Sequence, residues 1–355
     1  MESKVTFIDF ILQEWLVFTA AIALILTSFY TQHIPEYSVK ELQVIFILFV
    51  LFIVVTGLQK SGLILRIAQN IERGKAIPLK LVIITFFLSM IITIDVTLIV
   101  IIPITLSLNI DRKEFIVILE SLAANTGSSL TPFGNPQNLF IYWFYDLRPD
   151  TFVEAIAPFS LSFLCILAVI SLFLTTKTSV VNKPLQKVDK KAYCYAVLLI
   201  TVILTILHIV PTETAIIVIV FALIFDRRAF RVDYTLLVTF LLFFGIADNL
   251  KSILAPMLNH SGHIFLFSAL ASQVISNVPA TLLFAEHTQN WQALLWGANV
   301  GGLGGLFGSL ARLIVYKIYV RHESTNDTAR FTLLFLVTGY IAVLFSIGLY
   351  FVLYP

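Results

Sequence analysis

The most informative segment of the chain reads Ala124-Asn125-Thr126-Gly127-Ser128-Ser129-Leu130-Thr131-Pro132-Phe133-Gly134-Asn135-Pro136-Gln137-Asn138. It is rich in glycine, proline and amide side chains, yet it lies inside a longer apolar segment, Phe115 to Tyr145. Non-helical backbone survives at membrane depth only where protein or a wet cavity satisfies its N–H and C=O groups. The segment therefore predicts a transmembrane helix that is interrupted beside a candidate site.

A related segment follows in the second half of the chain. Ala298-Asn299-Val300-Gly301 aligns with Ala124-Asn125-Thr126-Gly127, and the same offset pairs Phe307-Gly308 with Phe133-Gly134 and Tyr316 with Tyr142. Upstream of each segment lies an apolar run with one polar break. Leu79 to Leu108 breaks at Thr93-Ile94-Asp95-Val96-Thr97 and Ile264 to Phe284 breaks at Ser276-Asn277-Val278-Pro279, which sets Asp95 opposite Asn277. These matches indicate an internal repeat.

We interpret residues 1–176 as the first repeat, residues 190–211 as a linker span and residues 212–355 as the second repeat. A single crossing by the linker gives the repeats opposite orientations, an arrangement typical of secondary transporters. Each repeat is expected to contain one re-entrant hairpin and one discontinuous helix. The predicted fold is an all-α polytopic membrane protein, one transmembrane domain over residues 1–355 with about nine spans and two hairpins.

Composition supports lipid as the solvent of this chain. Of the 355 residues, 59% are apolar and only 12% are charged, too few polar groups to cover a soluble surface. Apolar runs near the length of a transmembrane helix recur along the chain, at Trp15 to Phe29, Leu42 to Leu58, Phe152 to Leu174 and Phe331 to Leu353. A soluble enzyme is therefore excluded as an interpretation.

The positions of Lys and Arg predict the orientation in the cytoplasmic membrane. Of the 23 such residues, all fall in segments on one side of the predicted topology except Lys40, Arg148, Lys251 and the intrahelical Arg312. The positive-inside rule then puts the N-terminus inside and the C-terminus outside. If both hairpins crossed fully, the basic stretches at 177–191 and 227–231 would move outside. In each repeat, the Lys and Arg positions do not decide which of the two interrupted apolar segments is the hairpin and which is the span. Exchanging their roles leaves the flanking loops on the same side of the membrane.

Residues 124–138 resemble the glycine-rich "IG-T-IG-PPN" segment of the ion transporter superfamily, which includes the citrate transporter-like, divalent anion:sodium symporter and arsenite permease families. Ser276-Asn277-Val278-Pro279-Ala280-Thr281 is similar to the Ser-Asn-Thr hairpin tip of its sodium-coupled carboxylate members. The resemblance covers both repeats. It implies a homodimeric carrier whose substrate and sodium sites are formed by hairpin tips and interrupted helices.

The candidate substrate and ion site combines residues of both repeats. By the resemblance, the substrate and sodium sites map onto Asn125, Thr126 and Asn138 in one half and onto Asn277, Thr281 and Asn299 in the other, with sodium expected at Asn125, Asn277 and Asn299. The full set of candidates is Asp95, Thr97, Asn125, Thr126, Gly127, Thr131, Asn135, Asn138, Ser276, Asn277, Thr281, Asn299 and Gly301. An ionisable residue this deep in an apolar run favours a function for Asp95 as cation ligand or proton carrier. The plainer alternative is that Asp95 and the asparagines only cap helices.

One departure from the carboxylate symporters bears on the substrate. The first hairpin tip carries Asp95 where those symporters place asparagine, which is closer to the arsenite permease-like members. A fixed negative charge at that tip would repel a polyanion. Arg312 aligns with Asn138, and we expect it to bind an anion, to pair with Glu120 or Asp248, or to snorkel to the interface.

The leading hypothesis is a secondary active transporter of a small anion, coupled to sodium or protons by alternating access. Asp95 favours two alternatives, an arsenite or antimonite efflux permease and a sodium/proton antiporter, and a channel is a further class. The sequence has no His-Glu-x-x-His motif, no nucleophile with a histidine partner and no nucleotide-binding loop, so we expect neither an enzyme nor a cofactor. The expected partners are a small anion or metalloid, membrane lipid and a second copy of the chain, with no nucleic acid.

Overall fold

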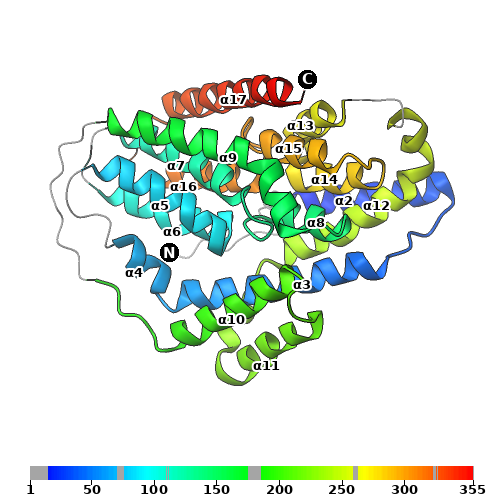
Figure 1. The fold of residues 1–355 in the computed structure, drawn as a ribbon, viewed down its shortest axis with the longest axis horizontal. Coiled ribbons are helices and arrows are strands. Elements are labelled where there is room, and N and C mark those ends of the chain that lie inside the picture. The colour runs from blue at the N-terminus through cyan, green and yellow to red at the C-terminus, as the bar shows by residue number, and fades with distance from the viewer. Residues whose placement is uncertain are drawn as a thin grey trace.

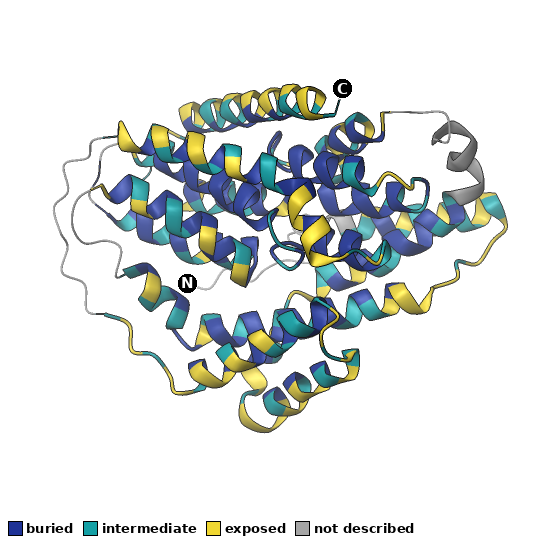
Figure 2. Cartoon of the chain, in the orientation of Figure 1, coloured by how far each residue is buried: buried dark blue, intermediate teal, exposed yellow. Residues whose placement is uncertain are grey.

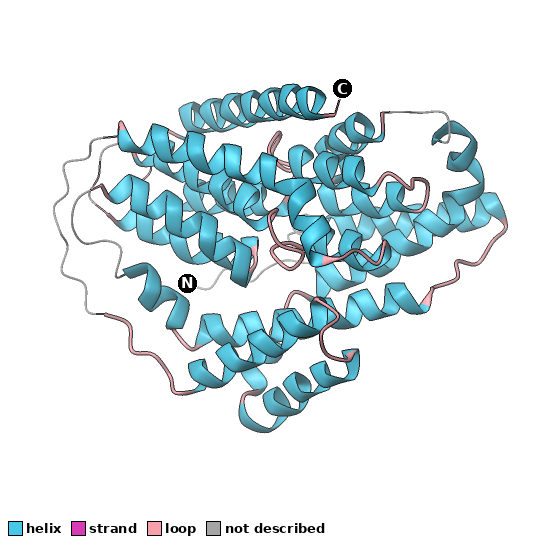
Figure 3. Cartoon of the chain, in the orientation of Figure 1, coloured by secondary structure: helices cyan, strands magenta, loops and turns pink. Residues whose placement is uncertain are grey.

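The computed structural model describes residues 15–69, 76–108, 110, 112–174, 185–258, 263–322, 325 and 327–354, with only the backbone described at 15, 16 and 251–258. All regular secondary structure within these ranges is helical (Figure 3). The prediction of an all-α protein is therefore confirmed over the part of the chain that the structure describes.

The first half of the chain runs from α2 to α9 (Figure 1). Its helices are α2 (Trp15–Thr31), α3 (Val39–Lys60), α4 (Leu63–Gln69), α5 (Ile77–Ile92), α6 (Ile94–Ser107), α7 (Lys113–Ser128), α8 (Pro136–Phe144) and α9 (Pro149–Leu172). The predicted hairpin is the helix pair α5–α6, and the predicted discontinuous helix is α7 followed by α8.

The second half has the same series of elements after the helix α10 (Lys191–Ile206). It contains η1 (Thr212–Ala215), α11 (Ile216–Phe225), η2 (Arg227–Phe230), α12 (Tyr234–Leu258), α13 (Ile264–Ile275), α14 (Asn277–Ala285), α15 (Trp291–Gly301), α16 (Leu310–Arg321) and α17 (Thr328–Leu353). Here α13–α14 is the helix pair, and α15 with α16 is the interrupted helix.

Among the described residues, three helices are long and apolar enough to cross a bilayer alone: α3, α9 and α17. Much of the surface of α17 is exposed and apolar, including Leu333, Leu344 and Val352 (Figure 2). A face of this kind suits lipid, which solvates apolar side chains without cost. The chain is a polytopic membrane protein, while the nine crossings, the re-entrant depth of the helix pairs and the inverted orientation stay predictions.

Each helix pair is broken at a single residue with unusual backbone geometry. Thr93 has φ 94° and ψ 149°, and Ser276 has φ 72° and ψ 158°. This region of φ/ψ space is populated almost only by glycine, and a residue with a side chain held there carries about 1–3 kcal/mol of strain. Two matched non-glycine residues in this conformation indicate breaks that the surrounding structure enforces.

The residue after each break is fixed by the same hydrogen bond. Ile94 donates its N–H to the Gly134 carbonyl over 3.1 Å, and Asn277 donates to the Gly308 carbonyl over 3.0 Å. Gly134 and Gly308 are the glycines that the repeat alignment pairs. By these contacts Ile94 corresponds to Asn277. The prediction that Asp95 lies opposite Asn277 is wrong by one residue.

The two halves interlock through the second arm of each helix pair. The first arms stay with their own half, since α5 packs on α7 and α13 packs on α15. The second arms cross over, because α6 packs on α16 of the second half and α14 packs on α8 of the first. At the edges of the view, α10 and α11 lie below α3, and α17 lies along the top (Figure 1). The four helix ends at the breaks and interruptions therefore lie between the two halves.

Candidate functional site

An asparagine cluster joins the two interrupted helices. Asn299, on α15, donates from Nδ2 to Oδ1 of Asn138 over 2.8 Å and accepts at Oδ1 from Nδ2 of Asn135 over 3.2 Å. Asn135 also caps α8 by accepting from the Asn138 N–H over 2.9 Å. All three side chains are buried. The hydrogen bonds between them hold the first half against the second.

Asn125 and Asn277 complete this cluster on either side of Gly302. A methyl group on Gly302 would lie 3.0 Å from Nδ2 of Asn277 and 3.4 Å from Oδ1 of Asn125. The Nδ2 of Asn125 donates to the Ser121 carbonyl over 2.9 Å, and the Oδ1 of Asn277 accepts from the Val278 N–H over 3.0 Å. The Oδ1 of Asn125 and the Nδ2 of Asn277 are therefore both next to the same small space beside Gly302.

The structure brings five of the predicted site residues into this asparagine cluster: Asn125, Asn135, Asn138, Asn277 and Asn299. Repeat symmetry holds in detail, because Asn125 and Asn299 each donate to the carbonyl four residues earlier, Ser121 and Leu295, over 2.9 and 2.8 Å. A pair of helix caps alone would not produce contacts between halves. Their arrangement supports a shared site, with capping as an added role of Asn135.

The predicted hydroxyl residues bond mainly to backbone. Thr97, Thr126 and Thr281 each donate to the carbonyl four residues earlier. Thr131 donates to the Met90 carbonyl of α5 over 2.7 Å and so ties the interruption to the helix pair. Ser276 faces a cavity instead. Of these hydroxyls, Ser276 is the one whose position allows contact with a solute.

Gly127 and Gly301 lie at helix crossings rather than in the asparagine cluster. A Cβ on Gly127 would lie 2.3 Å from the Phe86 carbonyl oxygen of α5, and one on Gly301 would lie 2.9 Å from the Ala269 carbonyl oxygen of α13. Small residues permit such close helix packing in membranes. Both glycines therefore set the distance between the helix pair and the interrupted helix of one half.

Two cavities reach the breaks of the helix pairs. One of about 360 Å³ is lined by Ser276 and Ser309 and by the basic residues Lys317 and Arg321. The other, of about 200 Å³, is lined by Thr93, Asp95 and Arg231. Asp233, Leu236, Leu310 and Ile314 line both. The two cavities are thus neighbours between α12 and α16.

Asp95 lies on the wall of the smaller cavity, whose lining includes none of the asparagines. The other residues of this wall come from α3, α6, α12, the segment before α12 and α16. Asp95 makes no described hydrogen bond to the asparagines, and the expectation that it shares their site stays a prediction. One residue along a helix rotates a side chain by about 100°. Since Ile94 occupies the place of Asn277, Asp95 points to another side of α6.

Four helices begin next to the asparagine cluster. α6 and α14 start directly after the breaks, and α8 and α16 start after the interruptions, at Pro136 and Leu310. Helix N-termini carry partial positive charge and free N–H groups, which suit an anion. Amide and carbonyl oxygens of the interruptions suit a hard cation such as sodium. The arrangement can accommodate a small anion together with a cation.

Arg312 is fully buried and faces α17. Its Nη2 donates to the Phe335 carbonyl over 2.8 Å, and its guanidinium lies 3.9 Å from the centre of the Phe335 ring. Its Nε and Nη1 have no hydrogen-bond partner among the described residues. The expected pairing with Glu120 or Asp248 is not found there, because Glu120 bonds to Thr105 and Asp248 bonds elsewhere. Snorkelling is wrong too, since the side chain is buried.

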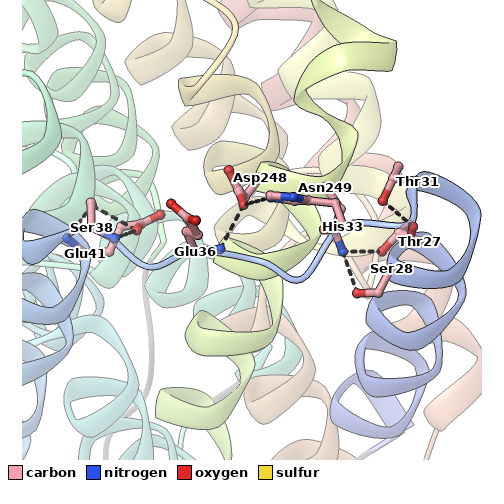
Figure 4. A network of polar contacts seen from close by, with 9 residues as sticks. All are labelled: Thr27, Ser28, Thr31, His33, Glu36, Ser38, Glu41, Asp248 and Asn249. Atoms are coloured by element: carbon pink, nitrogen blue, oxygen red, sulfur yellow. Dashed lines mark hydrogen bonds and ion pairs between the residues drawn. The ribbon is translucent and has the colours of Figure 1, made fainter.

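Asp248 belongs to a polar network that joins the α2–α3 loop to α12 (Figure 4). Its Oδ2 lies 3.0 Å from Nε2 of His33 and accepts from the Glu36 N–H over 2.9 Å. The neighbouring Asn249 donates to Ser28 over 2.8 Å. These residues are far along the chain from the breaks and connect the middle of α12 to the end of α2 and to the α2–α3 loop.

Sequence reasoning missed Gln273 and the role of Gly302. Gln273 donates to the Gly301 carbonyl over 2.7 Å and accepts from the Gly305 N–H over 2.8 Å. It holds the second interruption as Thr131 holds the first. A glutamine three residues before the Ser276 break, inside an apolar run, was the available signal. In the sequence, Gly302 was not distinguishable from the other glycines of the second interruption.

Comparison with known proteins identifies the family of this chain. The citrate transporter family profile (CitMHS) matches residues 5–301. The chain is 31% identical over 326 residues to an uncharacterized transporter of Methanocaldococcus jannaschii, covering 88% of this chain and 89% of that protein. It is 30% identical over 293 residues to the inner membrane protein YbiR of Escherichia coli K12, covering 76% and 77%. The resemblance to the citrate transporter-like proteins is thereby confirmed, and this chain belongs to the citrate transporter family.

Proposed function

We propose that the protein is a secondary active transporter that carries a small anion, of which citrate is the first to test, across the cytoplasmic membrane. Transport is coupled to sodium or protons and proceeds by alternating access between two inverted halves. The observation that carries this proposal is the asparagine cluster, in which amides of both halves meet beside the N-termini of four helices.

The groups left free in the cluster suit a carboxylate and a cation. A carboxylate oxygen accepts from the Nδ2 of Asn277, and a cation binds the Oδ1 of Asn125 on the other side of Gly302. Asn299 contributes through its bonds to Asn135 and Asn138. Because these partners belong to different halves, relative movement of the halves changes the geometry of the site.

The cavities give this conformation a direction. The larger cavity leads from Ser276 to Lys317 and Arg321, which the charge distribution assigns to the cytoplasmic side. Two basic residues and one acidic residue, Asp233, line it, and the net positive charge attracts an anion. This lining supports the proposal of an inward-facing conformation, with the N-terminus inside and the C-terminus outside. We propose further that the exposed apolar faces contact lipid and a second copy in a homodimer.

A second candidate rests on Asp95. Asp95 and Asp233 line the same cavity, which gives it an acidic side that suits a cation or a neutral metalloid better than a polyanion. Arsenite or antimonite efflux, or sodium/proton antiport, would use this cavity as the ion pathway. Arg231 in the same wall offsets part of the negative charge, so the anion carrier is the preferred function.

The deciding experiment reconstitutes the full chain in proteoliposomes. Uptake of radiolabelled citrate is measured with an inward sodium gradient, with an inward proton gradient and with neither, beside succinate, phosphate and arsenite. We expect citrate or another carboxylate to accumulate under one ion gradient and to show counterflow when preloaded. Arsenite or sodium movement without any carboxylate flux supports the second candidate, and flux without counterflow indicates a channel.

A further inference from the structure

Glu120 is a buried carboxylic acid with an incomplete set of hydrogen bonds. It lies near the middle of α7, about 10 Å along the helix axis from Lys113. Its side chain is 0% exposed. Oε1 lies 2.5 Å from the Thr105 hydroxyl of α6, and Oε2 has no hydrogen-bond partner in the described structure. Glu120 is not a member of the asparagine cluster and does not line either of the two cavities.

No opposite charge compensates the carboxyl of Glu120. Helices α5, α6, α9, α16 and α17 pack against α7. Their charged groups within the described ranges are Lys80, Asp95, Asp150, Glu154, Arg312, Lys317, Arg321 and Arg330, and α7 itself adds Lys113 and Glu114. Glu120 is in no ion pair with any of them, and Arg330 pairs with Glu114 instead. Thr105 is the group that contacts it.

Burial without a partner determines the protonation state in this conformation. An ionised carboxylate removed from water and from any cation costs several kcal/mol, so the group takes up a proton instead. The neutral acid shares a hydrogen bond with Thr105 and needs no counter-ion. Release of the proton requires water at Oε1 or Oε2, which requires separation of α6 from α7.

The position of Glu120 connects this event with transport. α6 packs both on α7 and on α16 of the other half, and Pro103 interrupts its hydrogen-bond ladder two residues before Thr105. On α7, the residue after Glu120 supplies the carbonyl that Asn125 binds. Movement of α6 away from α7 therefore changes the contact between halves and acts next to the asparagine cluster.

We propose that Glu120 is the proton-binding site that couples transport to the proton gradient. One proton binds the carboxylate when α6 and α7 are apart, the neutral acid closes against Thr105, and the same proton leaves on the opposite side after the halves have moved. The inference rests on the transport function proposed above and identifies its coupling ion. A purely structural role for the bond to Thr105 is the alternative to distinguish.

The transport test uses proteoliposomes that contain a pH-sensitive dye, with citrate as the probe. Glu120→Gln keeps size and the bond to Thr105 but binds no proton, and Glu114→Gln removes a partly exposed carboxyl of the same helix. We expect citrate-driven proton movement in the wild type and in Glu114→Gln, and at least a tenfold loss in Glu120→Gln with citrate counterflow kept. Wild-type proton movement per citrate in Glu120→Gln would overturn the proposal.

An infrared measurement tests the proton site without transport. Difference spectra of detergent-solubilised protein between acidic and alkaline buffer report the C=O stretch of protonated carboxyl groups. Other carboxyl groups contribute to the same region, so each variant is compared with the wild type. We expect one component of the wild-type band to be kept in Glu114→Gln, shifted in Thr105→Val and missing in Glu120→Gln. A band unchanged in Glu120→Gln would contradict the inference. If the band disappears in Glu120→Gln but the wild type transports no citrate in proteoliposomes, the proposed transport function is wrong and the assignment of Glu120 as a proton-binding site is kept.

Discussion

Asn299 on α15 donates a hydrogen bond from Nδ2 to Oδ1 of Asn138 on α8 over 2.8 Å, and the two residues belong to opposite halves of the chain. Both are buried, and Asn299 also accepts from Asn135. A bond of this kind does not follow from helix capping within one half. It makes the geometry of the candidate site depend on how the halves are placed, which is the requirement of alternating access.

Replacing Asn299 with alanine removes this connection. The Oδ1 of Asn138 and the Nδ2 of Asn135 both lose a buried partner, and each such loss costs about 1–3 kcal/mol. We expect citrate affinity to fall by about tenfold or more. Isothermal titration calorimetry on the solubilised protein measures it, and Asn249→Ala, which breaks a polar contact with Ser28 near the α2–α3 loop, serves as control. Equal affinities of Asn299→Ala and the wild type would contradict the assignment.

Gly302→Ala fills the space between Asn125 and Asn277. The new methyl group would lie 3.0 Å from the Asn277 amide nitrogen, tighter than ordinary contact, but this neighbour is a side chain that can shift, and the backbone carbonyl oxygen of Asn299 lies at an ordinary 3.4 Å. We expect folded protein that binds citrate at least tenfold more weakly. Gly348→Ala on α17 has nothing within 4 Å and should leave binding unchanged. Binding to immobilised protein by radioligand checks both variants, and intact affinity in Gly302→Ala would remove this space from the site.

Thr93→Gly and Ser276→Gly test the strain at the two breaks. Glycine adopts these φ/ψ values freely, and the strain of about 1–3 kcal/mol exceeds the roughly 0.5–1 kcal/mol that glycine loses in conformational entropy. We expect each variant to raise the free energy of unfolding by up to about 2 kcal/mol. Thermal unfolding in detergent measures this. Thr85→Gly, inside α5, is the control and should lower stability, and the same loss in Thr93→Gly would refute strain at the break.

Much of the fold could be predicted from the sequence because polar residues and glycines interrupt the apolar runs at the breaks. Thr93, Ser276 and the glycine-rich interruptions stand out in apolar runs, and the repeat alignment correctly paired Gly134 with Gly308. The register of the helix pairs was not predictable in the same way. It is set by the hydrogen bonds of Ile94 and Asn277 to those glycines, whereas the alignment matched polar residue types.

The candidate site was predicted in part for a similar reason. Asparagines in matched interruptions came together as expected, since the interlocked halves bring the interruptions to one place. Glu120 gave no such signal. The sequence suggested it only as a partner of Arg312, and the tertiary packing of α6 on α7 is what shows that its side chain is fully buried.

Asp95→Asn separates the two candidate functions. Asp95 lines a cavity with Arg231 and Asp233 and is in no described hydrogen bond with the asparagine cluster. If the protein carries an anion, removing this negative charge leaves the binding groups intact and reduces repulsion along the cavity. We then expect citrate uptake to continue, with an apparent affinity higher by about two- to fivefold at low salt and a smaller gain at high salt.

The matched control for Asp95→Asn is Asp233→Asn, which removes the other carboxylate of the same cavity and should act in the same direction. If instead the pathway carries a cation or exchanges sodium for protons, Asp95 is the ligand or the proton carrier. Asp95→Asn then abolishes sodium-dependent proton movement, while Asp233→Asn only weakens it. Initial rates of citrate uptake and of dye-reported proton movement, measured in the same vesicles, therefore assign the cavity to one function or the other.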